Sequence, residues 1–195
     1  MDFRCSFLVV TSFDYFSDKR RKNPEASILA HMQAFDLNHN STLVIKSINS
    51  QHFPEEHQEL KKLAQGRPDI VFMDDYFDSD KNLALLELAD VVLSLHRAEG
   101  YGINLADAMA RSTVVMATGY SGNLEFMNDS NSVLVPYSMT PVKRYANLDV
   151  ESMWAEPDVE YAARALRNLY LDRDMLRELA ARGHAHVLNQ HSLRV

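Results

Sequence analysis

Apolar residues along the chain follow two alternating patterns. Short runs rich in β-branched residues have the length of strands, and longer segments repeat their apolar residues at helical spacing. The short runs predict six strands, at Phe7–Thr11, Thr42–Ile48, Asp69–Met73, Val91–Leu95, Val114–Ala117 and Ser132–Val135. The longer segments predict six helices, at Pro24–Asn38, Pro54–Gln65, Ser79–Ala89, Gly102–Arg111, Pro157–Leu171 and Arg173–Asn189.

The strand runs are mostly continuous apolar stretches, without a regular alternation of polar residues, which is typical of strands buried on both faces. Strands that alternate with helices pair in parallel through crossover connections. We therefore expect an α/β fold, a Rossmann-like doubly wound parallel sheet, in one domain over residues 1–195. Such sheets bind ligands at the carboxyl ends of their strands, so functional residues should directly follow strands. The stretch Pro136–Glu156 shows neither pattern and is interpreted as a long irregular loop, either functional or disordered.

Composition narrows the class of protein. The chain has 195 residues, of which 46% are hydrophobic and 24% charged, as expected of a soluble globular domain. A formal net charge of −7 argues against nucleic acid as the main partner. Cys5 is the only cysteine, so no internal disulfide can form, which fits a reducing compartment. No apolar run is long enough to span a membrane. We expect a cytoplasmic protein, and leave open a peripheral contact with the inner membrane face.

The most informative segment is Leu95–Ala110, which reads LHRAEGYGINLADAMA. It joins a strand to a helix through a short loop with glycines on either side of Tyr101, and glycines let the backbone approach a ligand closely. The first turn of a helix favours an anion, for which a diphosphate is an obvious choice. Glu99 and Asp107 lie eight positions apart, so they could border one elongated ligand. Carboxylates suit sugar hydroxyls, which donate hydrogen bonds to them.

This segment resembles the signature of the family 4 retaining glycosyltransferases, which have the GT-B fold. The match begins with AEGYGINLADAMA and continues with VVMATGYSGNLEFM and NSVLV. The segment WAEPD is similar to bacterial members that build surface polysaccharides, often with mannose. The resemblance covers roughly residues 7–187. It implies that the chain is the C-terminal, donor-binding half of a GT-B enzyme whose N-terminal acceptor domain is absent from this chain.

The resemblance also implies roles for individual residues. Glu99 would contact the donor sugar and Asp107 the ribose, although the family normally has Glu at the second position. Lys22, in a loop after the first strand, would bind the diphosphate, with Arg21 or Arg20 in place of the family's arginine. We take Glu99 and Lys22 as the catalytic residues. The expected donor-binding residues are Arg21, His96, Arg97, Gly100, Tyr101, Gly102, Ile103 and Asp107, and the amides of Gly100–Ile103 would hold phosphate and sugar oxygens.

No metal site is expected, and no cofactor beyond the nucleotide-sugar substrate. Asp78, Ser79 and Asp80 resemble a metal-binding acid pair, but these residue types also cap the start of a helix, which is the preferred interpretation. His184 and His186 are two positions apart on a predicted helix, so their side chains diverge.

The implied reaction transfers a sugar from a nucleoside diphosphate to an acceptor hydroxyl with retention of configuration. The expected partners are the nucleotide-sugar donor, a saccharide or lipid-linked acceptor, and the N-terminal domain of the parent protein. Two other classes stay open: a nucleotide-sugar epimerase or phosphorylase of the same fold, and a nucleotide-sugar-binding module without catalytic activity. Asp at position 107 favours the last of these somewhat.

Overall fold

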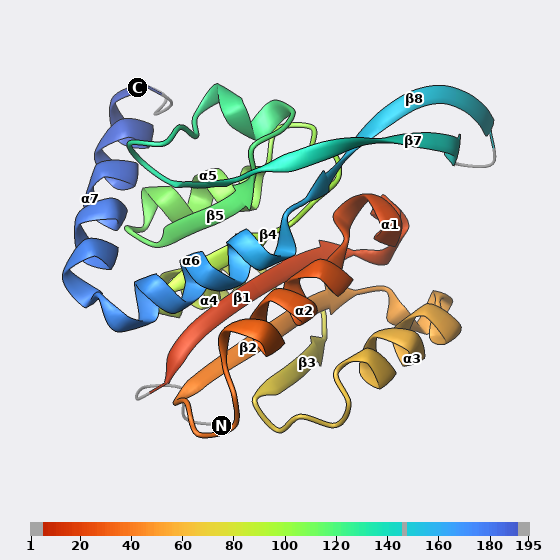
Figure 1. The fold of residues 1–195 in the computed structure, drawn as a ribbon, viewed down its shortest axis with the longest axis horizontal. Coiled ribbons are helices and arrows are strands. Elements are labelled where there is room, and N and C mark those ends of the chain that lie inside the picture. Colours follow the sequence, from red (N-terminus) through yellow and green to blue (C-terminus); the bar gives the residue numbers. More distant parts are fainter. Residues whose placement is uncertain (1–5, 146–147, 191–195) are drawn as a thin grey trace.

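The computed structural model describes residues 6–145 and 148–190, so Cys5 lies outside the described residues. Its centre is a six-stranded sheet in which every neighbouring pair of strands is parallel (Figure 1). The strand order is β3-β2-β1-β4-β5-β6. The strands are β1 (Phe7–Asp14), β2 (Ser41–Ile48), β3 (Ile70–Asp74), β4 (Val91–Ser94), β5 (Val114–Thr118) and β6 (Val133–Val135). This confirms the expected Rossmann-like doubly wound fold.

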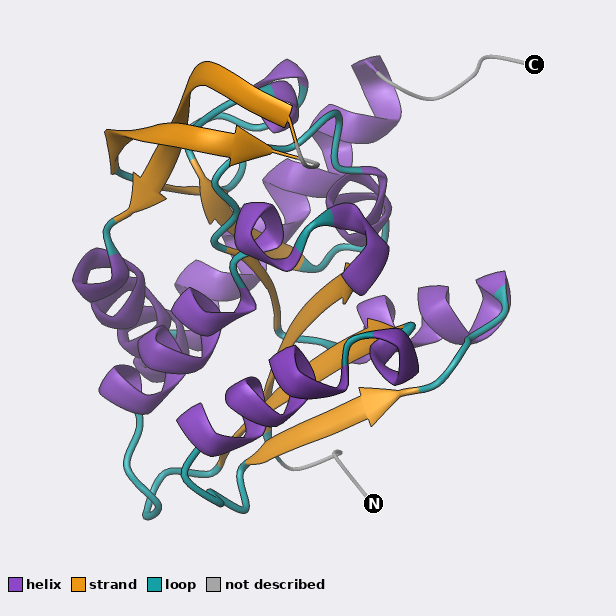
Figure 2. Ribbon diagram, turned by 90° about the vertical axis from the view of Figure 1, so that its right-hand side faces the viewer, coloured by secondary structure: helices purple, strands orange, loops and turns teal. Residues whose placement is uncertain are grey.

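Helices cover both faces of the sheet (Figure 2). The α-helices are α1 (Lys19–Lys22), α2 (Pro24–Ala34), α3 (Pro54–Leu63), α4 (Ser79–Leu88), α5 (Ile103–Ala110), α6 (Val159–Leu171) and α7 (Arg173–Gln190). Three 3₁₀ turns accompany them: η1 (Tyr15–Ser17), η2 (Ser50–His52) and η3 (Gly122–Glu125). No helix among residues 6–145 and 148–190 is long and apolar enough to cross a membrane.

The core has two layers because successive side chains of a strand point to opposite faces. In β1, Phe7 and Val9 pack with α2 and α6, whereas Leu8 and Val10 pack with α4 and α5. All four side chains are buried. The uniformly apolar strand runs therefore correspond to strands buried on both faces, as the sequence predicts.

The strand order reverses between β1 and β4, and the two strands separate there. β1 pairs with β2 over its whole length, from Phe7 to Asp14, but it pairs with β4 only at Val9 and Val10. In open α/β sheets such a reversal leaves a crevice at the carboxyl ends of the strands. The crevice between β1 and β4 is therefore the expected ligand position in this fold.

The prediction of an irregular loop at Pro136–Glu156 is wrong. This region contains β7 (Tyr137–Tyr145) and β8 (Leu148–Pro157), an antiparallel hairpin that forms a separate two-stranded sheet (Figure 1). An isolated hairpin is at best marginally stable in water, so it needs an anchor. Ala155 supplies one, because its side chain is buried and its amide donates to the carbonyl of Arg97 at 3.0 Å.

Candidate functional site

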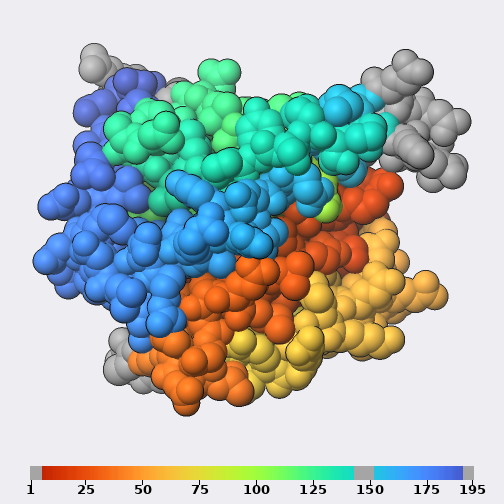
Figure 3. Space-filling view, in the orientation of Figure 1, coloured from red at the N-terminus to blue at the C-terminus, as the bar shows by residue number. Residues whose placement is uncertain are grey.

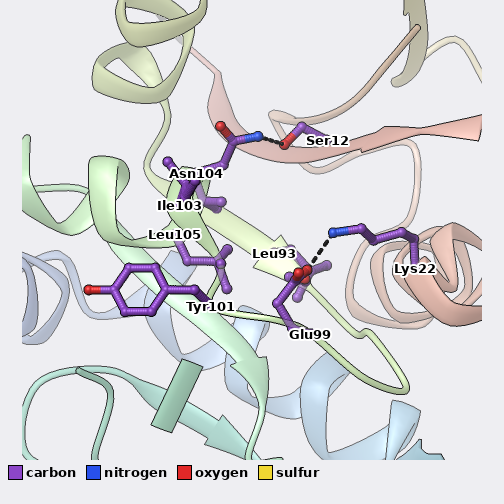
Figure 4. A pocket seen from close by; sticks show the side chains of 11 residues that line it. Ser12, Lys22, Leu93, Glu99, Tyr101, Ile103, Asn104 and Leu105 are labelled. Carbon is purple, nitrogen blue, oxygen red and sulfur yellow. Dashed lines mark hydrogen bonds and ion pairs between the residues drawn. The ribbon is translucent and has the colours of Figure 1, made fainter. Parts of the chain in front are cut away.

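A cavity of about 390 Å³ opens at the carboxyl ends of β1 and β4 (Figure 4). This volume lies within the range of small-molecule sites. The lining comes from both strands, from the end of α1, from the Glu99 loop and from the first turn of α5. The lining residues are Ser12, Lys22, Val92, Leu93, Ser94, Glu99, Tyr101, Gly102, Ile103, Asn104 and Leu105.

Lys22 and Glu99 point toward one another across the cavity (Figure 4). Lys22 Nζ donates to Glu99 Oε2, and both side chains are largely buried, at 19% and 12% exposed. The Gly100 amide donates to the other carboxylate oxygen, Oε1, at 3.0 Å. Arg21 Nη1 lies 3.6 Å from the same oxygen. The Glu99 carboxylate therefore accepts hydrogen bonds from Lys22 and the Gly100 amide and forms a longer ion pair with Arg21.

This arrangement favours the ionised form of Glu99. Burial alone would raise the pKa of Glu99, but the hydrogen bond and charge of Lys22, with the Gly100 amide and Arg21, lower it below its usual value. Glu99 is consequently a carboxylate at neutral pH, able only to accept hydrogen bonds.

Three hydrogen bonds to backbone carbonyls hold α1 against the Glu99 loop. The Arg97 amide donates to the carbonyl of Arg21 at 2.8 Å, and Arg21 Nη1 donates to the carbonyl of Ala98, also at 2.8 Å. Asn23 is buried and its amide group donates to the carbonyl of Leu95 at 3.0 Å. Because Asn23 directly follows Lys22, this contact fixes the end of α1 and with it the position of Lys22.

The basic run at residues 19–22 divides among different partners. Lys19 is buried against Glu25 at 2.7 Å and Glu59 at 3.3 Å, away from the cavity. Arg20 pairs with Asp18 at 2.9 Å and lies over the ring of Trp154, 5.8 Å from its centre. The helix that these residues form therefore gives Arg21, rather than Arg20, as the second cation beside Glu99.

The Gly100–Gly102 turn packs so closely against Gly122 that no side chain fits at position 122. A Cβ atom at Gly122, in the loop after β5, would stand 1.6 Å from the carbonyl oxygen of Gly100. The Gly122 amide donates to the carbonyl of Glu99 at 3.1 Å, which explains this close approach. Gly102 has φ +88°, a conformation that favours glycine, and it is the residue from which α5 begins.

The first turn of α5 reaches the cavity. Tyr101 and Ile103 are exposed at its edge, at 40% and 71%. Asn104 Nδ2 donates to Ser12 Oγ at 3.1 Å, a bond that bridges α5 and β1 (Figure 4). No side chain caps the start of α5. A helix start favours an anion, so this part of the cavity suits phosphate oxygens.

Five of the expected site residues do not line the cavity. Arg21 and the Gly100 amide instead contact the Glu99 carboxylate at its Oε1. Arg97 reaches the hairpin, where its Nε donates to Glu156 Oε2 at 2.6 Å. His96 is fully buried below the loop. Asp107 is half-buried further along α5, and its contact with ribose stays a prediction.

The sequence analysis did not identify six lining residues, of which three are polar, Ser12, Ser94 and Asn104, and three are apolar, Val92, Leu93 and Leu105. The three polar ones could contact a ligand through hydrogen bonds. Each is a small polar residue whose type is common in loops and strand ends, so no pattern distinguishes it. Their common signal is position, because Ser94 ends β4, Ser12 lies near the end of β1, and Asn104 is in the first turn of α5. Asp78, by contrast, caps α4 through its hydrogen bond from the Lys81 amide at 2.9 Å, as expected.

The fold is the Rossmann-like α/β type found in glycosyltransferases of the GT-B class. A family model described as "Family 4 Glycosyltransferase in conflict systems" matches residues 4–193, nearly the whole chain. The chain therefore belongs to this family, and the expectation of a glycosyltransferase is confirmed. No curated protein matches the chain.

Several solved structures share the fold. The C-terminal domain of the glycosyl transferase group 1 family protein LpcC from Francisella tularensis superposes with a TM-score of 0.72 at 20% identity, over 97% of this chain and 88% of that one. Anabaena Alr3699/HepE, solved with UDP and glucose, gives 0.68 at 17%, over 96% and 45%. A mutant of S. aureus TarM, solved with UDP among its ligands, gives 0.72 at 12%, over 98% and 34%. The chain thus spans less than half the length of the last two.

Proposed function

We propose that this chain is the donor-binding domain of a retaining glycosyltransferase that uses a nucleoside-diphosphate sugar. The observation that carries the proposal is the meeting of Lys22, Glu99 and the start of α5 in one cavity at the β1–β4 reversal. A cation and a helix start suit a diphosphate, and a carboxylate suits sugar hydroxyls. The nucleotides in the HepE and TarM structures support this class of ligand.

The main requirement of the reaction is to stabilise the negative charge that develops on the leaving group. The bond from the sugar C1 to the diphosphate oxygen breaks, and a bond from C1 to the acceptor oxygen forms on the same face of the ring. The proton of the acceptor hydroxyl passes to the departing diphosphate. Negative charge develops on the diphosphate, and donors that are already in place stabilise it most effectively. Lys22 and the first-turn amides of α5 would supply these donors.

Donor binding also requires an exchange of partners. In the structure Lys22 is paired with Glu99, so the diphosphate must take over this lysine. A diphosphate carries more negative charge than one carboxylate and competes well for it. The exchange releases Glu99 to accept hydrogen bonds from the sugar, which couples phosphate binding to sugar recognition.

The acceptor would come from outside this chain. HepE and TarM are more than twice as long as the part that this chain matches. We propose that an N-terminal domain of the parent protein binds a saccharide or lipid-linked acceptor, in the cytoplasm or at the inner membrane face. Mannose is a proposed donor sugar because the WAEPD segment resembles enzymes that use it.

Titration of this chain with UDP-glucose, GDP-mannose and their nucleoside diphosphates tests donor binding. We expect saturable binding of one nucleotide sugar, and no binding of any of the four would overturn the proposal. The full-length parent, given that donor and candidate acceptors, should form an α-linked product from an α-linked donor, as followed by NMR. Conversion of the free nucleotide sugar without acceptor would indicate an epimerase, and donor binding without turnover would indicate a binding module.

A further inference from the structure

A buried polar cluster lies directly beneath the Glu99 loop. Its centre is His96, whose side chain has no exposed surface. The ring contacts Ser94 from β4 on one side, and Asn123 from η3 and the carbonyl of Tyr120 on the other. Buried polar groups are expected to be hydrogen-bonded, so the contacts determine where the ring carries its proton.

The contacts assign a proton to Nε2. Asn123 Nδ2 donates to the carbonyl of Thr118 at 3.1 Å, which leaves Asn123 Oδ1 facing His96 Nε2 at 3.2 Å. The carbonyl of Tyr120 lies 3.2 Å from the same nitrogen. Both neighbours can only accept, so Nε2 is the donor.

The other ring nitrogen then accepts. Burial lowers the pKa of His96. The hydrogen bonds to Tyr120 and Asn123 and the charge of Glu99 raise the pKa but do not reverse this. The ring is therefore neutral and carries one proton, on Nε2. Its Nδ1 accepts from Ser94 Oγ at 2.9 Å. The single hydroxyl proton of Ser94 is thus directed into the protein.

This matters because Ser94 lines the cavity. With its proton engaged, its oxygen offers only lone pairs to a ligand, and it cannot bind a phosphate oxygen. We infer that Ser94 accepts a hydrogen bond from a hydroxyl of the donor sugar or ribose, and that His96 is the positioning residue that fixes this polarity. With Glu99, Ser94 supplies hydrogen-bond acceptors in the cavity, which select hydroxyls, whereas Lys22 and α5 supply the donors. The inference rests on the proposed function.

Three ligands test the role of Ser94 by calorimetry: inorganic pyrophosphate, a nucleoside diphosphate, and the nucleotide sugar that the wild type binds. Ser94→Ala should weaken the nucleotide sugar about fivefold and leave pyrophosphate unchanged. A loss already seen with the nucleoside diphosphate assigns the contact to ribose, and a loss seen only with the nucleotide sugar assigns it to the sugar. Ser130→Ala is the matched control, since Ser130 is exposed and lies outside the cavity lining.

An equal loss for pyrophosphate, or no loss for any ligand, would overturn the role of Ser94. If the wild type binds none of UDP-glucose, GDP-mannose and their nucleoside diphosphates, the proposed function itself fails, which the wild-type titration alone reveals. The role of His96 has its own readout, the ¹⁵N NMR signals of its ring at neutral pH. We expect a protonated Nε2 and an unprotonated Nδ1, and a proton on Nδ1 would refute the assignment.

Discussion

Lys22 Nζ donates to Glu99 Oε2 across 77 positions of sequence. The contact joins the end of α1 to the loop after β4, so it connects the two halves of the sheet at its reversal point. Both side chains are mostly buried, which strengthens the attraction relative to an ion pair in water. The predictions below use this pair and the loop that carries it.

Replacing Lys22 with Ala should weaken pyrophosphate and UDP much more than uridine. Each charge-assisted hydrogen bond contributes about 1.5–3 kcal/mol, so the loss should be about tenfold to a hundredfold in dissociation constant. Calorimetric titration measures all three ligands. Lys81→Ala is the control, because Lys81 is 71% exposed on α4. Equal losses for uridine and pyrophosphate would mean that Lys22 does not touch the phosphates.

Replacing Glu99 with Gln should leave pyrophosphate binding intact but impair sugar transfer. The neutral amide no longer competes for Lys22, so pyrophosphate should bind at least as tightly as it does to the wild type. Sugar transfer by the full-length parent should fall severely, since the carboxylate is the stronger acceptor for sugar hydroxyls. Glu87→Gln, on the exposed side of α4, should change neither. Near-normal transfer by the Glu99 variant would remove Glu99 from the donor site.

Glu99→Gln should also change how the free energy of unfolding depends on pH in acid. The pKa of Glu99 is lower in the folded chain than its ordinary value of 4.5, so the stabilisation is complete above that value and is lost as the pH falls through the folded pKa. The free energy of unfolding should therefore fall more for the wild type than for Glu99→Gln between about pH 6 and about pH 3.5. Urea unfolding at both pH values measures it. Parallel curves would contradict the lowered pKa.

Replacing Gly122 with Ala should displace the Gly100–Tyr101 peptide, because the new Cβ would overlap the Gly100 carbonyl at 1.6 Å. We expect a destabilisation of at least about 1–3 kcal/mol and a loss of donor binding. Gly100→Ala offers the steric control, since a Cβ there meets nothing within 4 Å and its melting temperature should stay near that of the wild type. If Gly122→Ala melts like the wild type, the loop does not approach η3 this closely.

The strand-helix alternation was enough to predict the sheet, because the central strands β4 and β5 are buried on both faces and their sequences are almost entirely apolar. The hairpin gives no such signal. β7 contains Pro141 and basic residues, and a two-stranded ribbon has no interior strand, so it tolerates a proline that a central strand would exclude. Its position depends on contacts with residues far along the chain, such as Arg97 with Glu156.

The site was only partly predictable, because the orientation of its side chains also depends on contacts between residues far apart in the sequence. Glu99 and the glycines are recognisable by residue type and spacing, and Lys22 by its place after β1. The orientation of Lys22 depends on the turn of α1 and on the bond from Asn23 to Leu95, neither of which leaves a pattern. The space-filling view shows the hairpin lying directly above the red segment that contains α1 (Figure 3), a proximity that no local sequence feature encodes.

The junction of β1 and β4 has a consequence for how the candidate site forms during folding. Thr11 Oγ1 bonds the carbonyl of Leu93 across 82 positions, so the two sides of the cavity meet only after a long loop has closed. A nascent chain that ends before β4 carries Lys22 without Glu99, and no intermediate lacking this junction holds a complete cavity. A nucleotide that binds only the finished junction raises the stability of the native state alone. Nucleotide binding therefore reports on the closure of this junction, and refolding followed by nucleotide binding should lag behind refolding followed by helix formation.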